Sequence, residues 1–256
     1  MIHATAIIHP AAQVGKDVRI GPYAVVGEHV VIGDRTTVGP HAVIEGRTAI
    51  GCDNQIFQFA SVGAIPQDLK YRGEETTLRI GDRNIVREFV TLHLGTASGG
   101  GETVIGNGNL FMAYCHVAHD CHVGNQVIMA NGSTLAGHVS VQDHAILGGL
   151  SAIHQFSRVG AHVMISGGAM VNQDIPPFTI AQGDRARTVG LNLVGLKRRG
   201  FSDETISAIK LAYRLVFRSG LRLEDALKKI MDEVGSVPEV ASFVGFIRDS
   251  QRGIAR

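Results

Sequence analysis

The chain has 256 residues, a mass of 27.3 kDa and a formal net charge of +1 at pH 7. The near-neutral charge and the lack of Trp argue against a nucleic-acid surface built from basic patches and aromatic platforms. No apolar run reaches the length of a membrane span and no signal peptide precedes the first repeat, so we expect a cytoplasmic protein. Cys52, Cys115 and Cys121 are too few and too scattered for a disulfide framework, which agrees with a reducing compartment.

An apolar residue recurs at every sixth position along most of the chain. The pattern holds for ten steps from Ile8 to Val62, returns at three positions between 80 and 92, and runs for twelve more steps from Ile105 to Val171. A period of six excludes a continuous α-helix, whose period is 3.6 residues. Hexapeptide repeats are typical of a parallel β-helix with one short strand per repeat.

The positions that follow the apolar residues also recur. The next residue is Gly in 12 of the 25 cases, which predicts a corner that needs positive φ or close backbone approach. The pattern resembles the left-handed hexapeptide family, in which three repeats complete one triangular coil. That resemblance, and not the spacing, implies the left-handed winding. Residue n then lies beside residue n+18, about 4.8 Å away.

Two polar stretches interrupt the repeat and divide the predicted β-helix of residues 1–186. Residues 66–79 carry a Pro and a Gly, and residues 93–104 include three consecutive Gly. Both are expected to be loops that leave the prism, and loops on rigid scaffolds often carry function.

A C-terminal helical domain is predicted for residues 187–256. Ser202 is a suitable N-cap for a helix that ends at Gly220, a second helix spans about 223–234, and residues 236–239 form a capping box for a third. Two interpretations remain open: the helices only cover the last coil, or they also help to bind substrate.

The coil spacing brings ionisable residues from three successive coils onto one patch. A His beside a carboxylate is suited to general-base catalysis near neutral pH, and a Gly N–H is suited to stabilising an oxyanion. A polar ladder on a solvent-facing surface is the alternative. By the same spacing His144 stacks on His162, a pair interpreted as structural. The residues of the patch are His116, His119, Asp120, Gly137, His138, His154 and Gln155.

Several motifs resemble the UDP-N-acetylglucosamine O-acyltransferase family, which catalyses the first step of lipid A synthesis. The resemblance covers the whole chain and is specific. It is carried by His-Val-Ala-His-Asp at 116–120, Leu-Ala-Gly-His-Val-Ser at 135–140, Ile-His-Gln-Phe at 153–156, Gln-Asp-Leu-Lys-Tyr at 67–71, Ile-Ala-Gln-Gly at 180–183 and Gly-Leu-Lys-Arg-Arg-Gly-Phe at 195–201.

The resemblance implies transfer of a (3R)-3-hydroxyacyl chain from acyl carrier protein to the 3-hydroxyl of UDP-N-acetylglucosamine. It also implies a homotrimer with sites between adjacent prisms, and a reaction that needs no cofactor or metal. His119 would be the general base, Asp120 would orient it, and the Gly137 N–H would hold the oxyanion. The substrate-binding positions would be Asp68, Lys70, His116, His138, His154 and Gln155, with Asn192, Arg198 and Arg199 on the nucleotide side. The acyl-chain groove would contain Gly149, Gly167 and Met170.

Two features leave the substrates partly open. Gly167 favours a long acyl chain because it leaves the groove open, whereas Met170 would shorten the groove. Val194 stands where family members often carry an acidic residue, so a ribose or base contact would be missing. An acceptor with a 3-amino group in place of the 3-hydroxyl therefore stays open.

A local cluster of positive charge lies near the predicted helical domain. It is either a solvated face or a docking site for the acidic carrier protein, whose association would then depend on salt. Its members are Arg185, Arg187, Lys197, Arg198 and Arg199.

Two further classes of function compete with acyl transfer. Some hexapeptide trimers bind zinc through three histidines, and His116, His119 and His138 would be the ligands here. The zinc would displace the general base and leave the other motifs unexplained. A non-catalytic scaffold is the third class, and it predicts that removing His119 changes nothing measurable.

Overall fold

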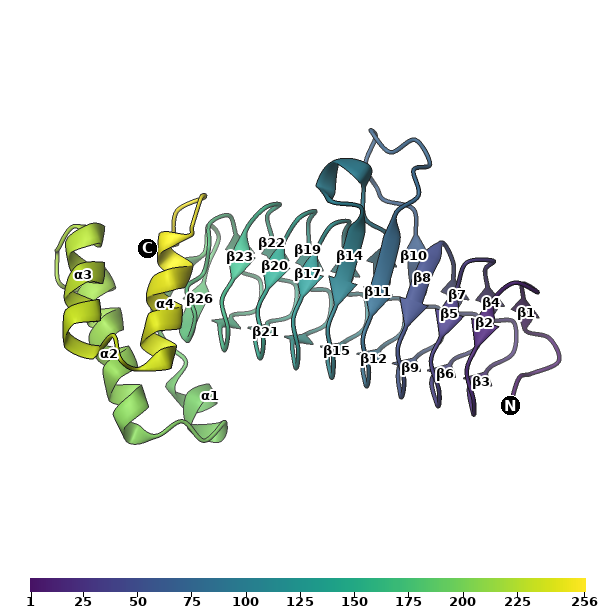
Figure 1. Cartoon of the computed structure of the whole chain (residues 1–256), viewed down its shortest axis with the longest axis horizontal. Helices are drawn as coiled ribbons and strands as arrows, with labels where there is room; N and C mark the ends of the chain where they lie inside the picture. The colour runs from purple at the N-terminus through teal and green to yellow at the C-terminus, as the bar shows by residue number, and fades with distance from the viewer.

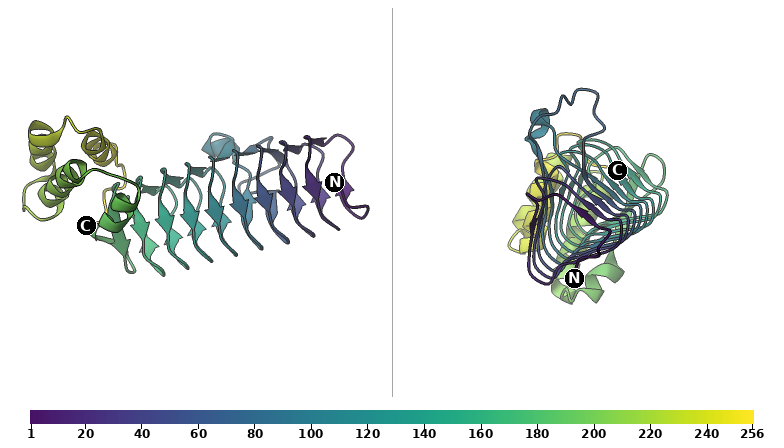
Figure 2. Two further views of the ribbon diagram at one scale, coloured as in Figure 1. Left: turned by 90° about the horizontal axis from the view of Figure 1, so that it is seen from below. Right: turned by 90° about the vertical axis from the view of Figure 1, so that its right-hand side faces the viewer.

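Three parallel sheets form the faces of an elongated triangular prism, and helices extend from its C-terminal end (Figures 1 and 2). The computed structural model describes residues 1–256. We name the faces sheet A, sheet B and sheet C, and the corners AB, BC and CA after the sheets that meet there. The chain passes through the faces in the order B, C, A in every coil, and it winds left-handed as predicted.

The strands are short and follow the hexapeptide repeat. Sheet B consists of β1 (Ile7–Ile8), β4 (Val25–Val26), β7 (Val43–Ile44), β10 (Ser61–Ala64), β13 (Thr91–His93), β16 (His116–Val117), β19 (Thr134–Leu135), β22 (Ala152–Ile153) and β25 (Met170–Val171). Sheet C consists of β2 (Gln13–Val14), β5 (Val31–Ile32), β8 (Arg47–Ile50), β11 (Thr77–Ile80), β14 (Glu102–Ile105), β17 (His122–Val123), β20 (Ser140–Val141) and β23 (Arg158–Val159). Sheet A consists of β3 (Arg19–Ile20), β6 (Thr37–Val38), β9 (Gln55–Ile56), β12 (Ile85–Val86), β15 (Leu110–Phe111), β18 (Ile128–Met129), β21 (Ile146–Leu147), β24 (Met164–Ile165), β26 (Thr179–Gln182) and β27 (Arg187–Leu191).

The strand register confirms the predicted spacing of eighteen residues outside the two loops and the last coil, where Met164 pairs with Ile180. Ile7 pairs with Val25, for example, and His116 pairs with Thr134. The sixfold apolar side chains point inward, and all are buried except Ile8 and Val14, which are half-buried at the N-terminal end of the prism. Burial of these side chains in columns is what stabilises the prism.

A Gly directly after the apolar position can be required by close backbone approach without positive φ, as Gly33 shows. Gly33 has negative φ, but a methyl group there would come within 2.6 Å of the Gly51 backbone in the next coil. Close approach therefore explains the Gly. Positive φ falls instead on the third residue after the apolar position, as at Asp120 (59°) and His138 (61°). The corner thus turns through a left-handed residue that still carries a side chain.

Both loops leave the prism at corner BC, over adjacent coils (Figure 1). They are shorter than predicted and comprise residues 65–76 and 94–101, the second with a 3₁₀ turn at Ala97–Gly99. The predicted ends at 79 and 104 were wrong because the last residues of each stretch are strands of sheet C. Thr77–Ile80 pairs with both neighbouring strands, so its backbone groups are satisfied only inside the sheet.

Four α-helices follow: α1 (Leu193–Arg198), α2 (Asp203–Phe217), α3 (Leu223–Val234) and α4 (Pro238–Arg248). The Ser202 N-cap is confirmed, because its side chain accepts a hydrogen bond from the Thr205 N–H. The capping box at 236–239 was wrong. Pro238 occupies the first helical position, which makes Val237 the N-cap and leaves Ser236 outside the helix.

The expected onset of helix at Arg187 was also wrong. Residues 187–191 form β27, which pairs antiparallel with β26 and extends sheet A. The helices bury their own apolar cluster, which is separate from the core of the prism. The division of the chain after residue 186 stays a prediction. None of the helices combines the length and apolarity that crossing a membrane requires.

Candidate active site

A cleft of about 790 Å³ lies at corner BC, where the two loops cover the middle coils. The first loop contributes Gln67, Asp68, Leu69 and Lys70, and the second contributes Ser98 and Gly99. The prism contributes His119, His138, Gln155 and Phe156 from three successive coils. Segments nearly ninety residues apart in the chain therefore line one concave site, which brings together Asp68, Lys70, His119, His138 and Gln155 from the predicted set.

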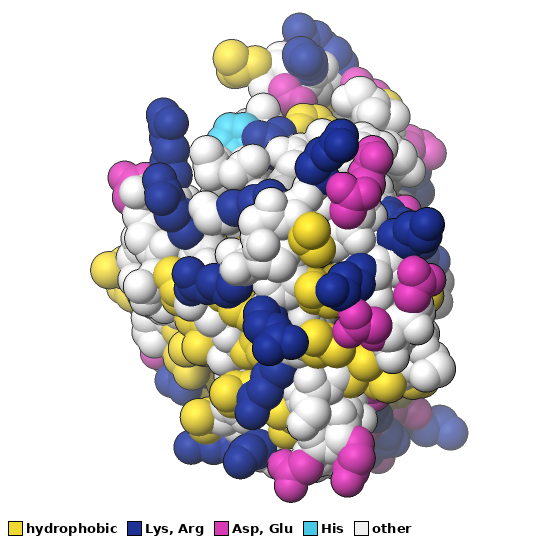
Figure 3. Space-filling view, turned by 90° about the vertical axis from the view of Figure 1, so that its left-hand side faces the viewer, with side chains coloured by type: hydrophobic (Ala, Val, Ile, Leu, Met, Phe, Trp, Pro, Cys, Tyr) yellow, Lys and Arg dark blue, Asp and Glu magenta, His cyan; other side chains and the backbone are white.

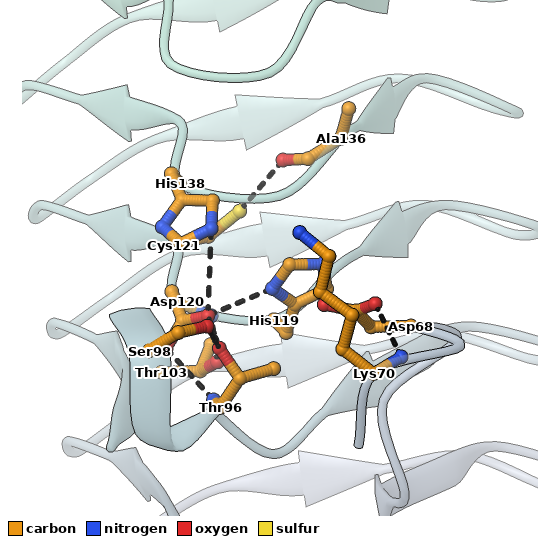
Figure 4. A network of polar contacts seen from close by, with 10 residues as sticks. All are labelled: Asp68, Lys70, Thr96, Ser98, Thr103, His119, Asp120, Cys121, Ala136 and His138. Carbon is orange, nitrogen blue, oxygen red and sulfur yellow. Dashed lines mark hydrogen bonds and ion pairs between the residues drawn. The ribbon is translucent and has the colours of Figure 1, made fainter. Parts of the chain in front are cut away.

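A buried carboxylate orients the His119 ring (Figure 4). The Nδ1 atom of His119 lies 2.7 Å from Oδ2 of Asp120, whose side chain is 0% exposed. Thr96 in the second loop donates its backbone N–H to Oδ1 at 2.8 Å and its hydroxyl to Oδ2 at 2.6 Å. An ionised carboxylate only accepts, so Nδ1 of His119 carries the proton and Nε2 has the free lone pair.

The backbone around Asp120 is fixed from two sides. Its N–H donates to the Thr103 hydroxyl at 2.8 Å, which holds the left-handed corner residue in place. Gly99 packs directly on the carboxyl group, and a methyl group at Gly99 would overlap it. The second loop therefore needs a Gly at 99 in order to close over Asp120 and exclude water from it.

Gly137 lies against the imidazole of His119, as the coil spacing predicts. A methyl group at Gly137 would come within 2.5 Å of Cε1 of that ring, so only Gly leaves room for it. The Gly137 N–H makes no hydrogen bond within the chain, whereas the N–H at the equivalent corner position of Asn125 is bonded to Asp143. The site thus presents an unpaired backbone donor beside a potential base.

Comparisons with known proteins agree with this geometry. A family profile described as bacterial transferase hexapeptide (six repeats) matches residues 11–46 and 102–137. A second profile, UDP N-acetylglucosamine O-acyltransferase domain 2, matches residues 174–255. Curated proteins named acyl-[acyl-carrier-protein]–UDP-N-acetylglucosamine O-acyltransferase are 57% identical over 255 residues (Myxococcus xanthus) and 56% identical over 260 residues (Janthinobacterium sp.), covering 100% of this chain and 99% of each relative.

The chain belongs to the UDP-N-acetylglucosamine O-acyltransferase family. The crystal structure of a UDP-N-acetylglucosamine acyltransferase from Bacteroides fragilis superimposes with a TM-score of 0.97 at 46% identity, over 100% of both chains. The acyltransferase fold therefore extends over the whole length of this family member, including its helical end.

A second cleft of this acyltransferase lies at corner CA, on another edge of the prism. It encloses about 560 Å³ and is lined by residues that include His144, His162, Arg198 and Arg199. His162 stacks on His144 with ring centroids 4.7 Å apart. Burial, His144 and Arg199 together lower the pKa of His162 to about 4. Arg198 and Arg199 are thus not beside His119 within one chain.

The remaining predicted positions are distributed around these clefts. Asn192 is the N-cap of α1: it accepts from the Gly195 N–H and donates to the His162 carbonyl, so its amide is engaged within the fold. His154 lies at corner BC beyond the first cleft. On the outer face of sheet B, Nδ1 of His116 lies 2.6 Å from the Thr91 hydroxyl.

The three groove positions lie near corner AB, on the far side of sheet B from the cleft. Gly149 and Gly167 are successive corner residues at which an added methyl group would meet only backbone atoms, and Met170 on β25 is exposed. Neither Gly residue therefore covers this corner with a side chain.

The potential metal ligands differ from the set considered in the sequence. Ligand atoms of His119, Asp120 and His138 lie within 4.8 Å of one another, whereas His116 is not in this group. Asp120 already accepts three hydrogen bonds, and its Oδ2 lies 3.8 Å from Nε2 of His138. Donors of the chain thus already occupy both oxygens of the carboxylate, which fits an orienting role better than metal ligation.

Sequence reasoning missed several residues around the first cleft. Phe156 lies eighteen residues after His138 and stacks on it at 4.3 Å, so the coil spacing contained the signal. Thr96, Ser98 and Arg252 had no such signal, because they belong to irregular segments whose path the repeat does not determine.

A pH effect on stability is expected from His93, which is 4% exposed and whose Nδ1 has no hydrogen-bond partner. Burial, followed by His116 and His119, lowers its pKa from 6.5 to about 4. Between pH 6.5 and 4 the unfolded chain binds a proton that the native chain does not, so stability falls as pH falls through this window. The maximal loss is about 3 kcal/mol.

Thermal unfolding from pH 7 to pH 4.5 tests this expectation. The change His93→Phe should flatten the fall in Tm, whereas His29→Gln at an exposed position should leave it unchanged. Equal losses in the wild type and His93→Phe would show that His93 is not a source of the acid sensitivity.

Proposed function

We propose that this family member transfers a (3R)-3-hydroxyacyl chain from acyl carrier protein to the 3-hydroxyl of UDP-N-acetylglucosamine, the first step of lipid A biosynthesis. One observation carries the proposed mechanism: His119 is held by buried Asp120 with Nε2 free, next to the unpaired N–H of Gly137. The three free thiols agree with a cytoplasmic location.

In the proposed step, Nε2 of His119 takes the proton of the 3-hydroxyl as the oxygen attacks the thioester carbonyl carbon. The developing oxyanion accepts a hydrogen bond from the Gly137 N–H. The tetrahedral intermediate then collapses, the C–S bond breaks, and the thiolate of the carrier takes the proton back from His119. Asp120 stabilises the imidazolium that exists between the two proton transfers.

The walls of the cleft are suited to a sugar. Asp68 and Lys70 from the first loop and Gln155 from the prism supply polar groups around His119. His138 supports the same wall: burial lowers its pKa, so it is neutral at pH 7 and stacks on Phe156. We assign sugar hydroxyl and phosphate contacts to these side chains, and to His154 and His116 at the edges.

The proposed enzyme is a homotrimer, because each chain carries two incomplete halves of a site. His119 lies at corner BC and the arginines Arg198 and Arg199 lie at corner CA. If three prisms place corner AB at a common axis, sheet B of one chain faces sheet A of the next. Corner BC of the first chain then meets corner CA of its neighbour, and one cleft contains both halves.

The outer surface of sheet A supports this arrangement. Its outward residues form a continuous apolar stripe with successive members in strand register, and each is only half-buried in one chain. Stripes of this kind on an isolated subunit indicate an interface. The residues are Ile85, Leu110, Ile128, Ile146, Met164 and Ile180.

Corner AB is also suited to the centre of a trimer. Five rings stack along it with centroids 4.9–5.2 Å apart, and Tyr114 at the end of the stack is 63% exposed. Aromatic surface of this extent is typical of interfaces. The rings belong to Tyr23, His41, Phe59, Phe89 and Tyr114.

The acyl chain would lie between the facing sheets and reach Gly149 and Gly167. Because neither residue has a side chain, we propose that the groove admits a long chain such as hydroxymyristoyl, with Met170 near its side. Val194 at the start of α1 is 63% exposed and supplies no polar group to the nucleotide.

The carrier protein would dock near the helical end. Arg185, Arg187, Lys197, Arg198 and Arg199 are all exposed, and none of them forms an ion pair within the chain. Figure 3 shows Lys and Arg side chains spread across this end of the molecule. Exposed cations of this kind steer an acidic partner, in a salt-dependent manner.

The direct test of the function is turnover by purified protein with UDP-N-acetylglucosamine and 3-hydroxyacyl carrier proteins of graded chain length. We expect an acylated sugar nucleotide, with the highest rate for a long chain. A parallel reaction with the 3-amino sugar nucleotide compares the two acceptors. No acylated product with any donor or acceptor would overturn the proposal.

A further inference from the structure

Arg252 lies in the C-terminal tail, close to the His119 cleft. A neighbouring hollow of about 390 Å³ is lined by residues that include Arg252, Arg158 and Asp249, and it shares His138 and Phe156 with the His119 cleft. The two hollows therefore adjoin at the stacked His138 and Phe156 side chains. We infer that Arg252 is a further substrate-binding residue and that it holds a phosphate group of the sugar nucleotide.

The tail places Arg252 rigidly. After α4 the chain returns to the prism, where the Asp174 N–H donates to the Gly253 carbonyl at 3.0 Å and the Ala255 N–H donates to the Asp174 carbonyl at 2.9 Å. The Ser250 hydroxyl donates to the Asp174 carboxylate at 2.7 Å, and Ile254 is buried. Arg252 thus projects from a backbone that is tied on both sides to corner BC.

The guanidinium is half-buried and has no anionic partner. Its Nη2 lies 3.2 Å from the Asn172 carbonyl and 3.3 Å from Nδ1 of His154, and its Nη1 makes no hydrogen bond. Neither nearby acid forms an ion pair with it: no carboxylate oxygen of Asp174 or Asp249 lies within 4.0 Å of the guanidinium, and Asp174 accepts from the Ser250 hydroxyl and the Arg158 N–H. A partly desolvated cation with free donors favours a bound anion.

His154 lies against the same guanidinium. Its Nδ1 is 3.3 Å from Nη2 of Arg252 and 3.1 Å from the Gln155 carbonyl, so the ring is held beside the cation. The N–H groups that remain free on Arg252 suit the oxygens of a phosphate.

The distance between His154 and His119 along the prism indicates which phosphate group Arg252 binds. Gln155, adjacent to His154, lies two coils beyond His119, which corresponds to about 10 Å at the spacing of neighbouring strands. A pyranose ring with its 3-hydroxyl at His119 places its anomeric diphosphate on this scale. The phosphate of an extended pantetheine arm lies farther from the thioester, so the diphosphate of the sugar nucleotide is the better match.

The variants Arg252→Gln and Arg252→Lys test the inference, which rests on the proposed acyl transfer. With Gln we expect the KM for UDP-N-acetylglucosamine to rise about tenfold or more, with kcat and the KM for acyl carrier protein within about threefold. Lys should recover part of the affinity, because it keeps the charge without the bidentate geometry. Arg248→Gln, at an exposed position on α4, is the matched control and should change neither constant.

Calorimetric binding of UDP-N-acetylglucosamine and of UDP needs no turnover, so it separates failure of this inference from failure of the proposed function. We expect both ligands to bind more weakly to Arg252→Gln than to the wild type. If Arg252→Gln does not fold, the loss in Arg252→Lys is the readout. Unchanged binding, a fall in kcat alone, or a rise confined to the KM for the carrier protein would overturn the assignment of Arg252 to the diphosphate.

Discussion

Replacing His119 with Ala is expected to lower kcat about 10³-fold, because a positioned general base contributes roughly 10²–10⁴ to such reactions. The KM for each substrate should change far less, since the ring acts mainly on proton transfer in the transition state. His119 is a 15% exposed side chain at a corner, and its removal deletes no part of the apolar core. Circular dichroism and Tm should therefore match the wild type.

His122→Ala provides the matched control, because His122 is exposed on sheet C only three residues away. We expect its kcat to stay within about twofold of the wild type. Asp120→Asn should fall between the two variants, since the amide keeps the packing against Thr96 but no longer stabilises an imidazolium. Activity of His119→Ala within tenfold of the wild type would contradict the general-base mechanism and would favour a scaffold or another base.

Mixing two inactive variants should restore activity if each cleft draws on two subunits. His119→Ala damages corner BC, and the double change Arg198→Ala with Arg199→Ala damages corner CA. In co-expressed trimers assembled at random from equal amounts, about one quarter of the clefts receive an intact corner from each chain. Turnover should therefore reach about a quarter of the wild-type value, although each variant alone is inactive.

Two controls make the mixing experiment decisive. Co-expression of His119→Ala with Asp120→Asn should give no turnover beyond the average of the two variants alone, because both changes damage corner BC. Light scattering should report particles of three chains of 27.3 kDa each in every sample. Mixed trimers without recovered turnover would show that the arginines of corner CA do not complete the site of a neighbouring chain.

The residues that stack on successive coils at corner BC were predictable because the backbone is periodic. The hexapeptide pattern determines the coil, and the coil spacing places Gly137 against His119 and His138 next to Asp120. The same spacing accounts for the stacking of His144 on His162 and of His138 on Phe156. Local signals were reliable where one residue sets a terminus, as at Ser202, and they failed where Pro238 moved the helix start by one residue.

The sequence alone determined one short strand per six residues, because an apolar residue at every sixth position is buried inward. The family resemblance added the coil of eighteen residues and its hand, and with that spacing the sequence placed the polar residues on one corner. The tertiary structure alone decided what closes over those residues. Thr96 reaches Asp120 from a loop, and Arg252 reaches His154 from a tail nearly a hundred residues later in the chain. Such contacts depend on the path of irregular backbone, which is set by packing and hydrogen bonds between distant segments and leaves no period in the sequence.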